Sequence, residues 1–316
     1  MVAPLRLGVV GAGRVFQRLY LPAIAAQRGW VLAAVADPAG ERRAIAAAAG
    51  METFDDVTAM LNGVQLDGVA ILTAPALHVS LAEEVLRRGL PVLVEKPVAP
   101  GLEPIRRWRD EGWLDRVTVG FARRFWPTYQ RLRRAAAGAS DVRFGIRSNP
   151  AGWAAVTAHD MHPLVNLTPH FIDLARWLTG VEPDAVYVEA GSNGARLRFH
   201  FDQRVVTATG VLGAPYFEGA RFDGHAFSLG PPSPRESAWR RVRSQPQPDT
   251  AAFARLLALW AEHLRGRPSP DLPGARDIWA SVAIAEAAAK APIGAAPTRL
   301  VFDPWDYASL NRGTGA

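Results

Sequence analysis

One lysine stands where its side chain could act on a bound molecule. Lys96 follows a short apolar run at residues 91–94, in the stretch Leu93-Val94-Glu95-Lys96-Pro97. A parallel strand over that run places Lys96 at a carboxyl end, the edge at which open α/β sheets bind ligands. A lysine there bonds a substrate oxygen, lowers the pKa of a hydroxyl or relays a proton. A surface lysine paired with Glu95 is the alternative, and these residues alone leave both open.

A glycine turn near the start of the chain supplies a second motif. The stretch Gly8-Val-Val-Gly11-Ala-Gly13-Arg14-Val15-Phe16 follows one apolar run and opens a helical pattern. In such a turn, Gly11 permits the tight bend and Gly13 lets the backbone approach a pyrophosphate, which the helix start at Arg14 and Val15 then binds. Phe16 stands where the strict pattern has Gly or Ala. That departure concerns helix packing more than phosphate contact.

Asp37 extends this motif to the ribose. It ends the second apolar run, 24 residues after Gly13, where an acidic side chain bonds the ribose hydroxyls of a dinucleotide. A carboxylate at that point repels a 2′-phosphate, so the sequence favours NAD over NADP. Arg42 and Arg43 lie close by in sequence and keep NADP open. A turn residue before a proline is the alternative reading of Asp37.

Alternating apolar runs and helical patterns must position these residues. Strands are predicted at 5–10, 30–36, 68–72, 91–94 and 117–121, and helices at 15–28, 41–49 and 77–88. Strands that alternate with helices indicate βαβ units and a parallel sheet buried on both faces. The pattern then changes. A helix is predicted at 167–178, an antiparallel sheet at 185–189, 195–201 and 205–212, a loop at 230–250, and two helices at 251–264 and 275–290.

Length and composition set the broad class. The chain has 316 residues, 49% of them hydrophobic, and a formal charge of +6. Two domains are the natural expectation, and no apolar run is long enough to span a bilayer. The start of the chain reads as a strand and not as a signal peptide, and there are no cysteines, so we expect a cytoplasmic protein. The arginines are scattered, which favours an anionic small ligand over nucleic acid.

Taken together, these motifs resemble a known family. The elements are Gly11-x-Gly13, Asp37, Glu95-Lys96-Pro97, Gly120-Phe121 with Arg124-Phe125, and Pro169-His170-Phe171-Ile172-Asp173-Leu174. In order and spacing they resemble the Gfo/Idh/MocA oxidoreductases, which include glucose–fructose oxidoreductase and inositol dehydrogenases. The resemblance spans nearly the whole chain.

The resemblance implies an α/β protein of two domains. Residues 1–121 would form a Rossmann domain with a doubly wound parallel sheet. Residues 122–316 would form an α+β domain on an open, mainly antiparallel sheet that binds substrate and often assembles a homo-oligomer, a dimer or a tetramer. The implied chemistry is hydride transfer between a nicotinamide and a carbinol or keto carbon of a sugar, cyclitol or nucleotide-sugar-like substrate.

The resemblance also implies roles for particular residues. Lys96 and His170 would flank the reacting carbon, the histidine as proton carrier and the lysine as stabiliser of the oxyanion. Asn166, one helical turn before His170, would position the substrate. Arg123 and Arg124 would contribute to the substrate cleft, where packing at the domain junction is the alternative. The implied cofactor contacts are Gly11, Gly13, Arg14, Val15, Asp37, Thr73, His78, Glu95 and Lys96.

Three departures from the family pattern bear on activity. Asn166 replaces a common Asp and cannot act as a base. His162-Pro163 stands in place of a glycine pair, and Thr73-Ala74-Pro75-Ala76-Leu77-His78 lacks the usual Asn. A catalytically degraded dinucleotide-binding protein, or an enzyme acting on a C=N bond, therefore stays open beside the oxidoreductase. His159, Asp160 and His162 lack the spacing of a familiar metal pair, so no metal site is predicted.

Overall fold

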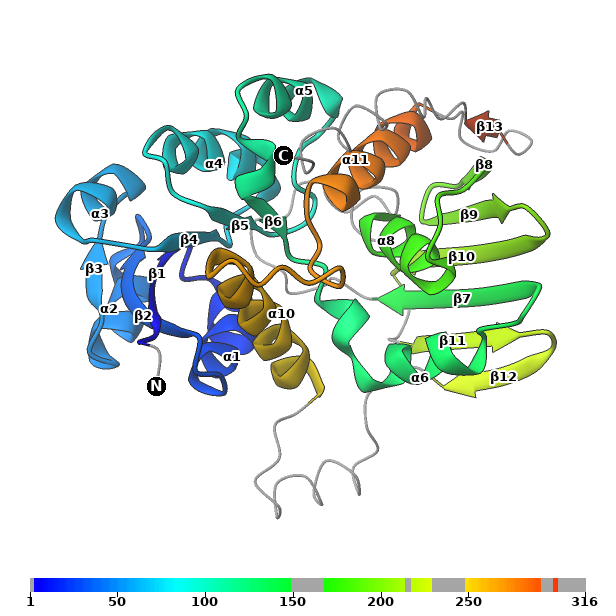
Figure 1. Ribbon diagram of the computed structural model, residues 1–316, viewed down its shortest axis with the longest axis horizontal. Helices are drawn as coiled ribbons and strands as arrows, with labels where there is room; N and C mark the ends of the chain where they lie inside the picture. Colours follow the sequence, from blue (N-terminus) through cyan, green and yellow to red (C-terminus); the bar gives the residue numbers. More distant parts are fainter. Residues whose placement is uncertain (1–2, 149–167, 214–216, 229–247, 291–297, 301–316) are drawn as a thin grey trace, which may run out of the picture. The chain divides into compact units, whose positions relative to one another are not determined.

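The chain folds into two compact units, each made of segments distant in sequence. The computed structural model describes residues 3–148, 168–213, 217–228, 248–290 and 298–300 (Figure 1). Unit 1 comprises Met1–Ala99, Glu103–Trp126 and Pro234–Ile278. Unit 2 comprises Pro100–Leu102, Pro127–Ser233 and Trp279–Ala316.

Unit 1 is built on a six-stranded parallel sheet with the strand order β3-β2-β1-β4-β5-β6. Its strands are β1 (Leu5–Val10), β2 (Trp30–Ala36), β3 (Glu52–Phe54), β4 (Gly68–Ile71), β5 (Val92–Val94) and β6 (Val117–Val119). The order reverses between β1 and β4, and ligands bind beyond the carboxyl ends of the strands at such a reversal. The central strands are buried on both faces, which explains their continuous apolar sequence.

Short helices connect these strands. They are η1 (Phe16–Tyr20), α1 (Leu21–Ala25), α2 (Gly40–Ala48), α3 (Val57–Gly63), η2 (Pro75–Leu77), α4 (His78–Arg87), α5 (Leu102–Asp110), η3 (Leu114–Arg116) and η4 (Ala122–Phe125). The predicted parallel Rossmann-type sheet is therefore confirmed. One predicted helix, at 15–28, is a π-helical turn over Phe16–Tyr20 followed by an α-helix that ends at Ala25.

A late helix completes unit 1. Helix α10 (Pro248–Leu264) packs against η1, α1 and β2. The Trp30 indole donates to the Leu257 carbonyl at 2.9 Å, and the Trp30 and Trp260 rings lie 4.4 Å apart. The sequence assigned this segment to the domain at 122–316. Its apolar face instead covers the first unit, because Trp30 and the helices beside it offer the hydrophobic surface that α10 buries.

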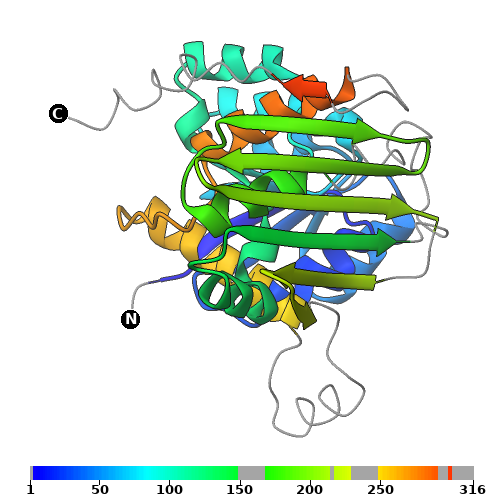
Figure 2. The same ribbon diagram turned by 90° about the vertical axis from the view of Figure 1, so that its right-hand side faces the viewer.

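Unit 2 is built on a seven-stranded mixed sheet with the order β12-β11-β7-β10-β9-β8-β13 (Figure 2). Its strands are β7 (Asp141–Ser148), β8 (Ala185–Ala190), β9 (Gly194–Phe201), β10 (Arg204–Leu212), β11 (Phe217–Phe222), β12 (His225–Ser228) and β13 (Thr298–Leu300). All pairs are antiparallel except β7 with β10, so the predicted, mainly antiparallel sheet is confirmed.

Alternation along the strands gives this sheet one apolar face. In β7, Val142, Phe144 and Ile146 are buried while the residues between them are not. Helix α8 (Thr168–Thr179) packs on β9 and β10, and the Phe171 ring meets Phe144 edge to face at 5.5 Å. Helices α6 (Pro127–Ala135) and α11 (Ala275–Ala289) complete the described helices of this part of the chain, the first residues of α11 belonging to unit 1.

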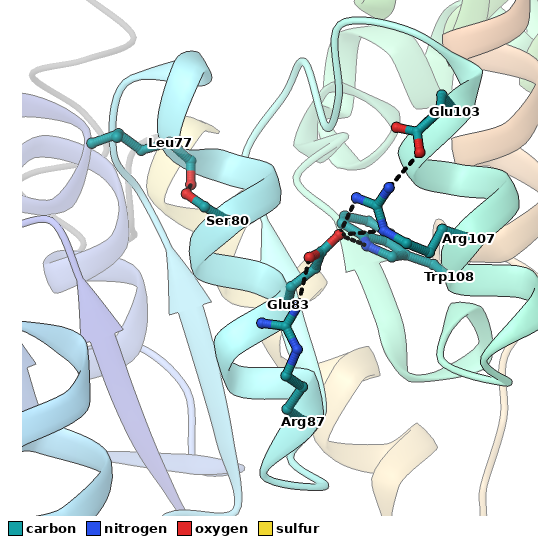
Figure 3. Close-up of polar contacts among 7 residues, drawn as sticks. All are labelled: Leu77, Ser80, Glu83, Arg87, Glu103, Arg107 and Trp108. Carbon is teal, nitrogen blue, oxygen red and sulfur yellow. Dashed lines mark hydrogen bonds and ion pairs between the residues drawn. The ribbon is translucent and has the colours of Figure 1, made fainter.

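A buried glutamate joins α4 to α5 in unit 1. Glu83 is 8% exposed, and its carboxylate accepts from Arg87 at 2.8 Å, from Arg107 and from the Trp108 indole at 3.2 Å (Figure 3). Arg107 also bonds the exposed Glu103. Burial alone would raise the pKa of Glu83, but the hydrogen bonds from Arg107 and Trp108 outweigh it and lower that pKa. The carboxylate is therefore held charged inside the fold.

Within the described ranges, no helix is long and apolar enough to cross a membrane. The same residues hold no cluster of three or more His, Cys, Asp or Glu side chains able to bind a metal ion. His159, Asp160 and His162 lie outside the described residues.

Candidate cofactor and catalytic site

The glycine turn has the geometry of a phosphate cradle. Gly11 has φ +96°, and a Cβ there would lie 2.9 Å from the Leu72 carbonyl oxygen, so only glycine fits. A Cβ at Gly13 would meet nothing within 4 Å, which leaves open space over the turn. Helical backbone begins at Arg14, which is exposed, and continues through the half-buried Val15. This arrangement presents a helix start beside an open backbone, as a pyrophosphate requires.

The replacement of the third glycine has a structural counterpart. Phe16 is fully buried in the core of unit 1, and it begins the π-helical turn. The bulky side chain thus lies at the start of a turn with the i→i+5 backbone hydrogen bonds of a π-helix. The departure lies on the packing side of the helix and leaves the glycine turn intact.

Asp37 ties the end of β2 to the glycine turn. Its carboxylate accepts from the Ala12 amide at 2.8 Å and from the Ala39 amide at 2.9 Å, and the side chain is 2% exposed. Arg42 lies 3.4 Å from the same carboxylate, while Arg43 donates to the Asp37 carbonyl at 2.7 Å and pairs with Asp55. The carboxylate is thus held at the strand end beside the glycine turn, where a ribose would lie.

Lys96 lies just beyond the carboxyl end of β5 and is half-buried. Its neighbour Glu95 is 9% exposed; one carboxylate oxygen accepts the Tyr20 hydroxyl at 2.8 Å and the other the Lys96 amide at 3.1 Å. Gly120, beyond β6, packs on this pair: a Cβ there would lie 2.7 Å from the Glu95 carboxylate. The lysine therefore stands at the ligand-binding edge next to a buried acid.

Burial shifts the pKa values of this group. Desolvation lowers the pKa of Lys96 to about 8, with Glu95 opposing and Arg123 assisting the shift. Desolvation raises the pKa of Glu95, against the lowering effects of Lys96 and Tyr20. Burial, and then the charge of Glu95, raise the pKa of Tyr20 well above its usual value. A lysine with a pKa near 8 can exchange a proton close to neutral pH.

His78 braces the two loops beside Lys96. The side chain is 1% exposed, and its ring nitrogens lie 2.8 Å from the Pro97 carbonyl and 3.0 Å from the Thr73 carbonyl. Burial lowers the pKa of His78, and the charge of Lys96 lowers it further, against the effect of the two carbonyls. Thr73 is half-buried, with its hydroxyl 3.4 Å from the Ala74 carbonyl. His78 thus fixes the loops that end β4 and β5, with both ring nitrogens on backbone.

The two adjacent arginines differ. Arg123 is half-buried, stacks over the Trp126 ring at 4.9 Å and acts electrostatically on Lys96. Arg124 is 3% exposed and donates to Asp277 at 2.5 Å within unit 1. Arg123 therefore adds positive charge near Lys96, whereas Arg124 ties the segment after β6 to the start of α11.

The predicted residues of the second unit are partly described. His170 lies in the first turn of α8 and is half-buried, and Asp173, one turn later, is 1% exposed. Lys96 belongs to unit 1 and His170 to unit 2. Asn166 lies outside the described residues.

Sequence reasoning missed Tyr20 as part of this site. Its signal is weak, because a tyrosine on the apolar face of a helix is usual in a core, and its partner Glu95 lies 75 residues away. A stronger signal was present for Lys96: it is one of two lysines in a chain with 34 arginines. Arginine stays charged in proteins, whereas lysine changes its pKa readily on burial.

A family model described as "Oxidoreductase family, NAD-binding Rossmann fold" matches residues 5–110. Among curated proteins, the rhizopine catabolism protein MocA of Rhizobium meliloti is 33% identical over 193 residues, which are 56% of this chain and 58% of that protein. The inositol 2-dehydrogenase of Rubrobacter xylanophilus is 28% identical over 301 residues, 85% of each chain. The match spans less than two thirds of the first curated relatives' own length.

Solved structures share the fold. The scyllo-inositol dehydrogenase of Lactobacillus casei, in a crystal structure with bound NAD(H) and scyllo-inositol, superposes with a TM-score of 0.70 at 17% identity. The superposition covers 89% of this chain and 95% of that one. This likeness extends the match from the dinucleotide-binding region to both units.

Proposed function

Because the chain belongs to the Gfo/Idh/MocA oxidoreductase family, we propose that it is an NAD(H)-dependent oxidoreductase of CH–OH groups. The observation that carries the proposal is Lys96, half-buried beyond β5, where His78 links the next residue, Pro97, to the loop after β4 that packs against Gly11. The proposed substrate is a small polar alcohol or its ketone, with a cyclitol first among the candidates, since relatives are named inositol 2-dehydrogenases.

The residues of unit 1 fit a dinucleotide. Gly11 permits the tight turn, Gly13 leaves open space for the pyrophosphate above the start of the helix at Arg14, and Asp37 would bond the ribose. The carboxylate of Asp37 repels a 2′-phosphate, and Arg43 is already engaged by Asp37 and Asp55. NAD is therefore the proposed cofactor. When bound, the nicotinamide supplies the hydride acceptor for oxidation and the donor for reduction.

Lys96 is the proposed catalytic residue of unit 1. In its protonated form it donates to the substrate oxygen and stabilises the negative charge that develops as a hydride leaves or arrives. Arg123 adds positive charge near the same point, which suits an oxyanion or an anionic substituent. His170 is the proposed proton carrier, because a histidine titrates near neutral pH, and Asn166 is the proposed residue that orients a substrate hydroxyl.

Two measurements test the proposal on the purified full chain. The fluorescence of NADH and NADPH on titration gives the two dissociation constants, and NADH should bind more tightly. A panel of myo-inositol, scyllo-inositol, sugars and sugar acids with NAD⁺ should then produce NADH with at least one member. Tighter binding of NADPH would overturn the cofactor assignment.

The same panel separates the alternatives. Binding of NADH with no turnover of any alcohol or ketone would favour a dinucleotide-binding protein without catalysis. Turnover only when an amine accompanies the ketone would favour C=N chemistry. Either result would leave the cofactor site in place and remove the alcohol from the proposal.

We also propose that the chain works in the cytoplasm and as a homo-oligomer. In support, the second face of the unit 2 sheet presents half-buried side chains, among them Tyr187, Thr207 and Thr209, suited to contact with another chain. Light scattering coupled to size exclusion measures the mass in solution, and a monomer at working concentration would overturn the oligomer.

A further inference from the structure

The group behind Lys96 contains a buried acid and a buried hydroxyl that the proposed chemistry does not use. Glu95 is 9% exposed and Tyr20 is fully buried, so neither is placed to touch a substrate. Both nonetheless belong to the immediate surroundings of Lys96: the Tyr20 hydroxyl donates to Glu95 at 2.8 Å, and Glu95 accepts the Lys96 amide at 3.1 Å. A buried carboxylate is costly unless its oxygens are bonded, so this arrangement requires a reason.

We propose that Tyr20 and Glu95 are positioning residues that keep Lys96 protonated, the Tyr20 hydroxyl by stabilising the Glu95 carboxylate and the carboxylate by its negative charge. The proposal rests on the proposed function, since it assigns Lys96 a protonated working state. Its test below measures the lysine directly and does not depend on turnover.

The local structure is built around this pair. The π-helical turn Phe16–Tyr20 ends at Tyr20, whose ring meets Phe253 of α10 edge to face at 4.9 Å, so the hydroxyl points from a fixed ring. On the opposite side, Gly120 leaves the space that Glu95 fills: a Cβ at that glycine would lie 2.7 Å from the carboxylate and 3.1 Å from the Tyr20 hydroxyl. A larger residue at position 120 would therefore have to displace the Glu95 carboxylate.

The charges around Lys96 show why support is needed. The negative charge of Glu95 raises the pKa of Lys96, whereas the positive charge of Arg123 lowers it. Lys96 in turn lowers the pKa of His78, whose ring nitrogens lie on the Pro97 and Thr73 carbonyls. Among the described residues, two titratable groups act on Glu95, namely Lys96 and Tyr20. Burial and Arg123 both favour the neutral amine. The charge of Glu95 therefore decides how much of the lysine stays protonated at neutral pH.

The hydroxyl of Tyr20 helps to keep Glu95 charged: burial raises the pKa of Glu95, and the charge of Lys96 and then the Tyr20 hydrogen bond oppose that shift. A hydrogen bond to a carboxylate stabilises the ionised form, and burial disfavours it. Without that bond, Glu95 takes up a proton at higher pH, its charge falls, and the pKa of Lys96 falls with it. The two residues thus act in series on the lysine.

The sequence permits a direct measurement, because Lys96 and Lys290 are the two lysines of the chain. Lys290 is 73% exposed and pairs with Glu286 on the surface, so it serves as an internal reference. Full-length protein labelled with ¹³C at the lysine ε-carbon gives two lysine signals, which a Lys290→Arg variant assigns. Their chemical shifts against pH report each pKa, with and without NAD⁺.

Two variants separate the two steps. Tyr20→Phe keeps the ring and removes the hydroxyl, and Glu95→Gln keeps the shape and removes the charge. We expect the pKa of Lys96 to fall by about half a unit in Tyr20→Phe and by about one unit in Glu95→Gln. In both variants, any measurable turnover should lose its alkaline activity at correspondingly lower pH.

The matched control is a second buried tyrosine–glutamate pair. Tyr129 is fully buried and its hydroxyl donates to Glu218 in unit 2, so Tyr129→Phe removes the same bond from the other unit. It should leave the Lys96 pKa unchanged. A Lys96 pKa that stays constant in both Tyr20→Phe and Glu95→Gln overturns the proposal, whatever the activity. A shifted pKa in a chain that turns over no alcohol supports it and counts against the proposed function instead.

Discussion

Unit 1 buries two glutamates that the fold treats in opposite ways. Glu83 and Glu95 are 8% and 9% exposed, yet hydrogen bonds lower the pKa of the first while burial raises that of the second. Glu83 accepts from two guanidinium groups and an indole (Figure 3). Glu95 accepts from one hydroxyl and one amide, and the cation beside it is a lysine whose own pKa is lowered by burial.

The difference separates a charge that connects two helices of the fold from one that we propose acts on a catalytic lysine. Arginine does not lose its proton in proteins, so the pairs of Glu83 with Arg87 and Arg107 stay ionic across the ordinary pH range. The Glu95–Lys96 pair lies where each partner's proton depends on the other. Two equally buried glutamates therefore have different effects. Glu83 forms a permanent ionic link between α4 and α5, whereas Glu95 forms a pair with Lys96 whose protonation changes with pH.

The largest expected effect is on turnover. Lys96→Met removes the proposed stabiliser of the oxyanion and should lower kcat/KM by about a thousandfold, while the NADH dissociation constant changes little. Glu83→Gln should leave kcat/KM within a factor of two, as its side chain lies between α4 and α5. Steady-state kinetics and NADH fluorescence measure both. Normal turnover by Lys96→Met would show that Lys96 is not the catalytic residue of unit 1.

The next effect is on stability. Glu83→Gln leaves two arginines and an indole with a weaker acceptor and should lower the free energy of unfolding by about 1–3 kcal/mol. Urea unfolding followed by tryptophan fluorescence gives the value, since Trp108 donates to this carboxylate. An unchanged midpoint would show that the network contributes no net stability.

The two glutamates should also respond to acid with opposite signs. The pKa of Glu83 is lower in the folded chain, so its contribution is present above 4.5 and is lost as the pH falls through the folded value. The pKa of Glu95 is higher in the folded chain, so its contribution grows as the pH falls from neutral toward 4.5.

Unfolding free energies of wild type, Glu83→Gln and Glu95→Gln between pH 7 and the acid range test this. The unfolding free energy of wild type should exceed that of Glu83→Gln by less once the pH falls below the ordinary glutamate pKa. Relative to Glu95→Gln, the unfolding free energy of wild type should rise as the pH falls from neutral toward that pKa. Parallel pH profiles for the two differences would contradict the contrast.

The smallest expected effect belongs to the exposed partner of the same arginine. Glu103 bonds Arg107 as Glu83 does, but its side chain is 76% exposed. Glu103→Gln should change the free energy of unfolding by less than about 0.5 kcal/mol, because water screens such a pair. A loss equal to that of Glu83→Gln would show that Arg107, and not burial of the acid, determines the contribution.

The predictability of the elements followed their burial. The strands β1 and β2 occupy the predicted residues, since apolar runs buried on both faces are conspicuous in sequence. Strand β7 was not predicted: its Val142, Phe144 and Ile146 alternate with polar residues and Gly145. Helix α5 was also missed, because most of its nine residues are charged or exposed and the buried ones are Pro104, Ile105 and Trp108.

The residues of the candidate site also differ in how well the sequence predicts their positions. Lys96 and Asp37 are strand-end residues, and their positions follow from the sheet topology. The partner of Glu95 does not follow from any local pattern, because it is set by how η1 packs over β5 and β6. Nor does sequence show that His78 holds two backbone carbonyls, which depends on two loops from different strands.

The late arrival of α10 bears on how the protein forms during synthesis. Leu256, Leu257 and Trp260 complete the core around Trp30, more than 220 residues after it in the chain. Unit 1 therefore cannot close its core until most of the polypeptide has left the ribosome, and contacts so distant in sequence form slowly. A fragment cut after residue 126 would expose an apolar surface that α10 normally covers, and would have the properties of an aggregation-prone intermediate.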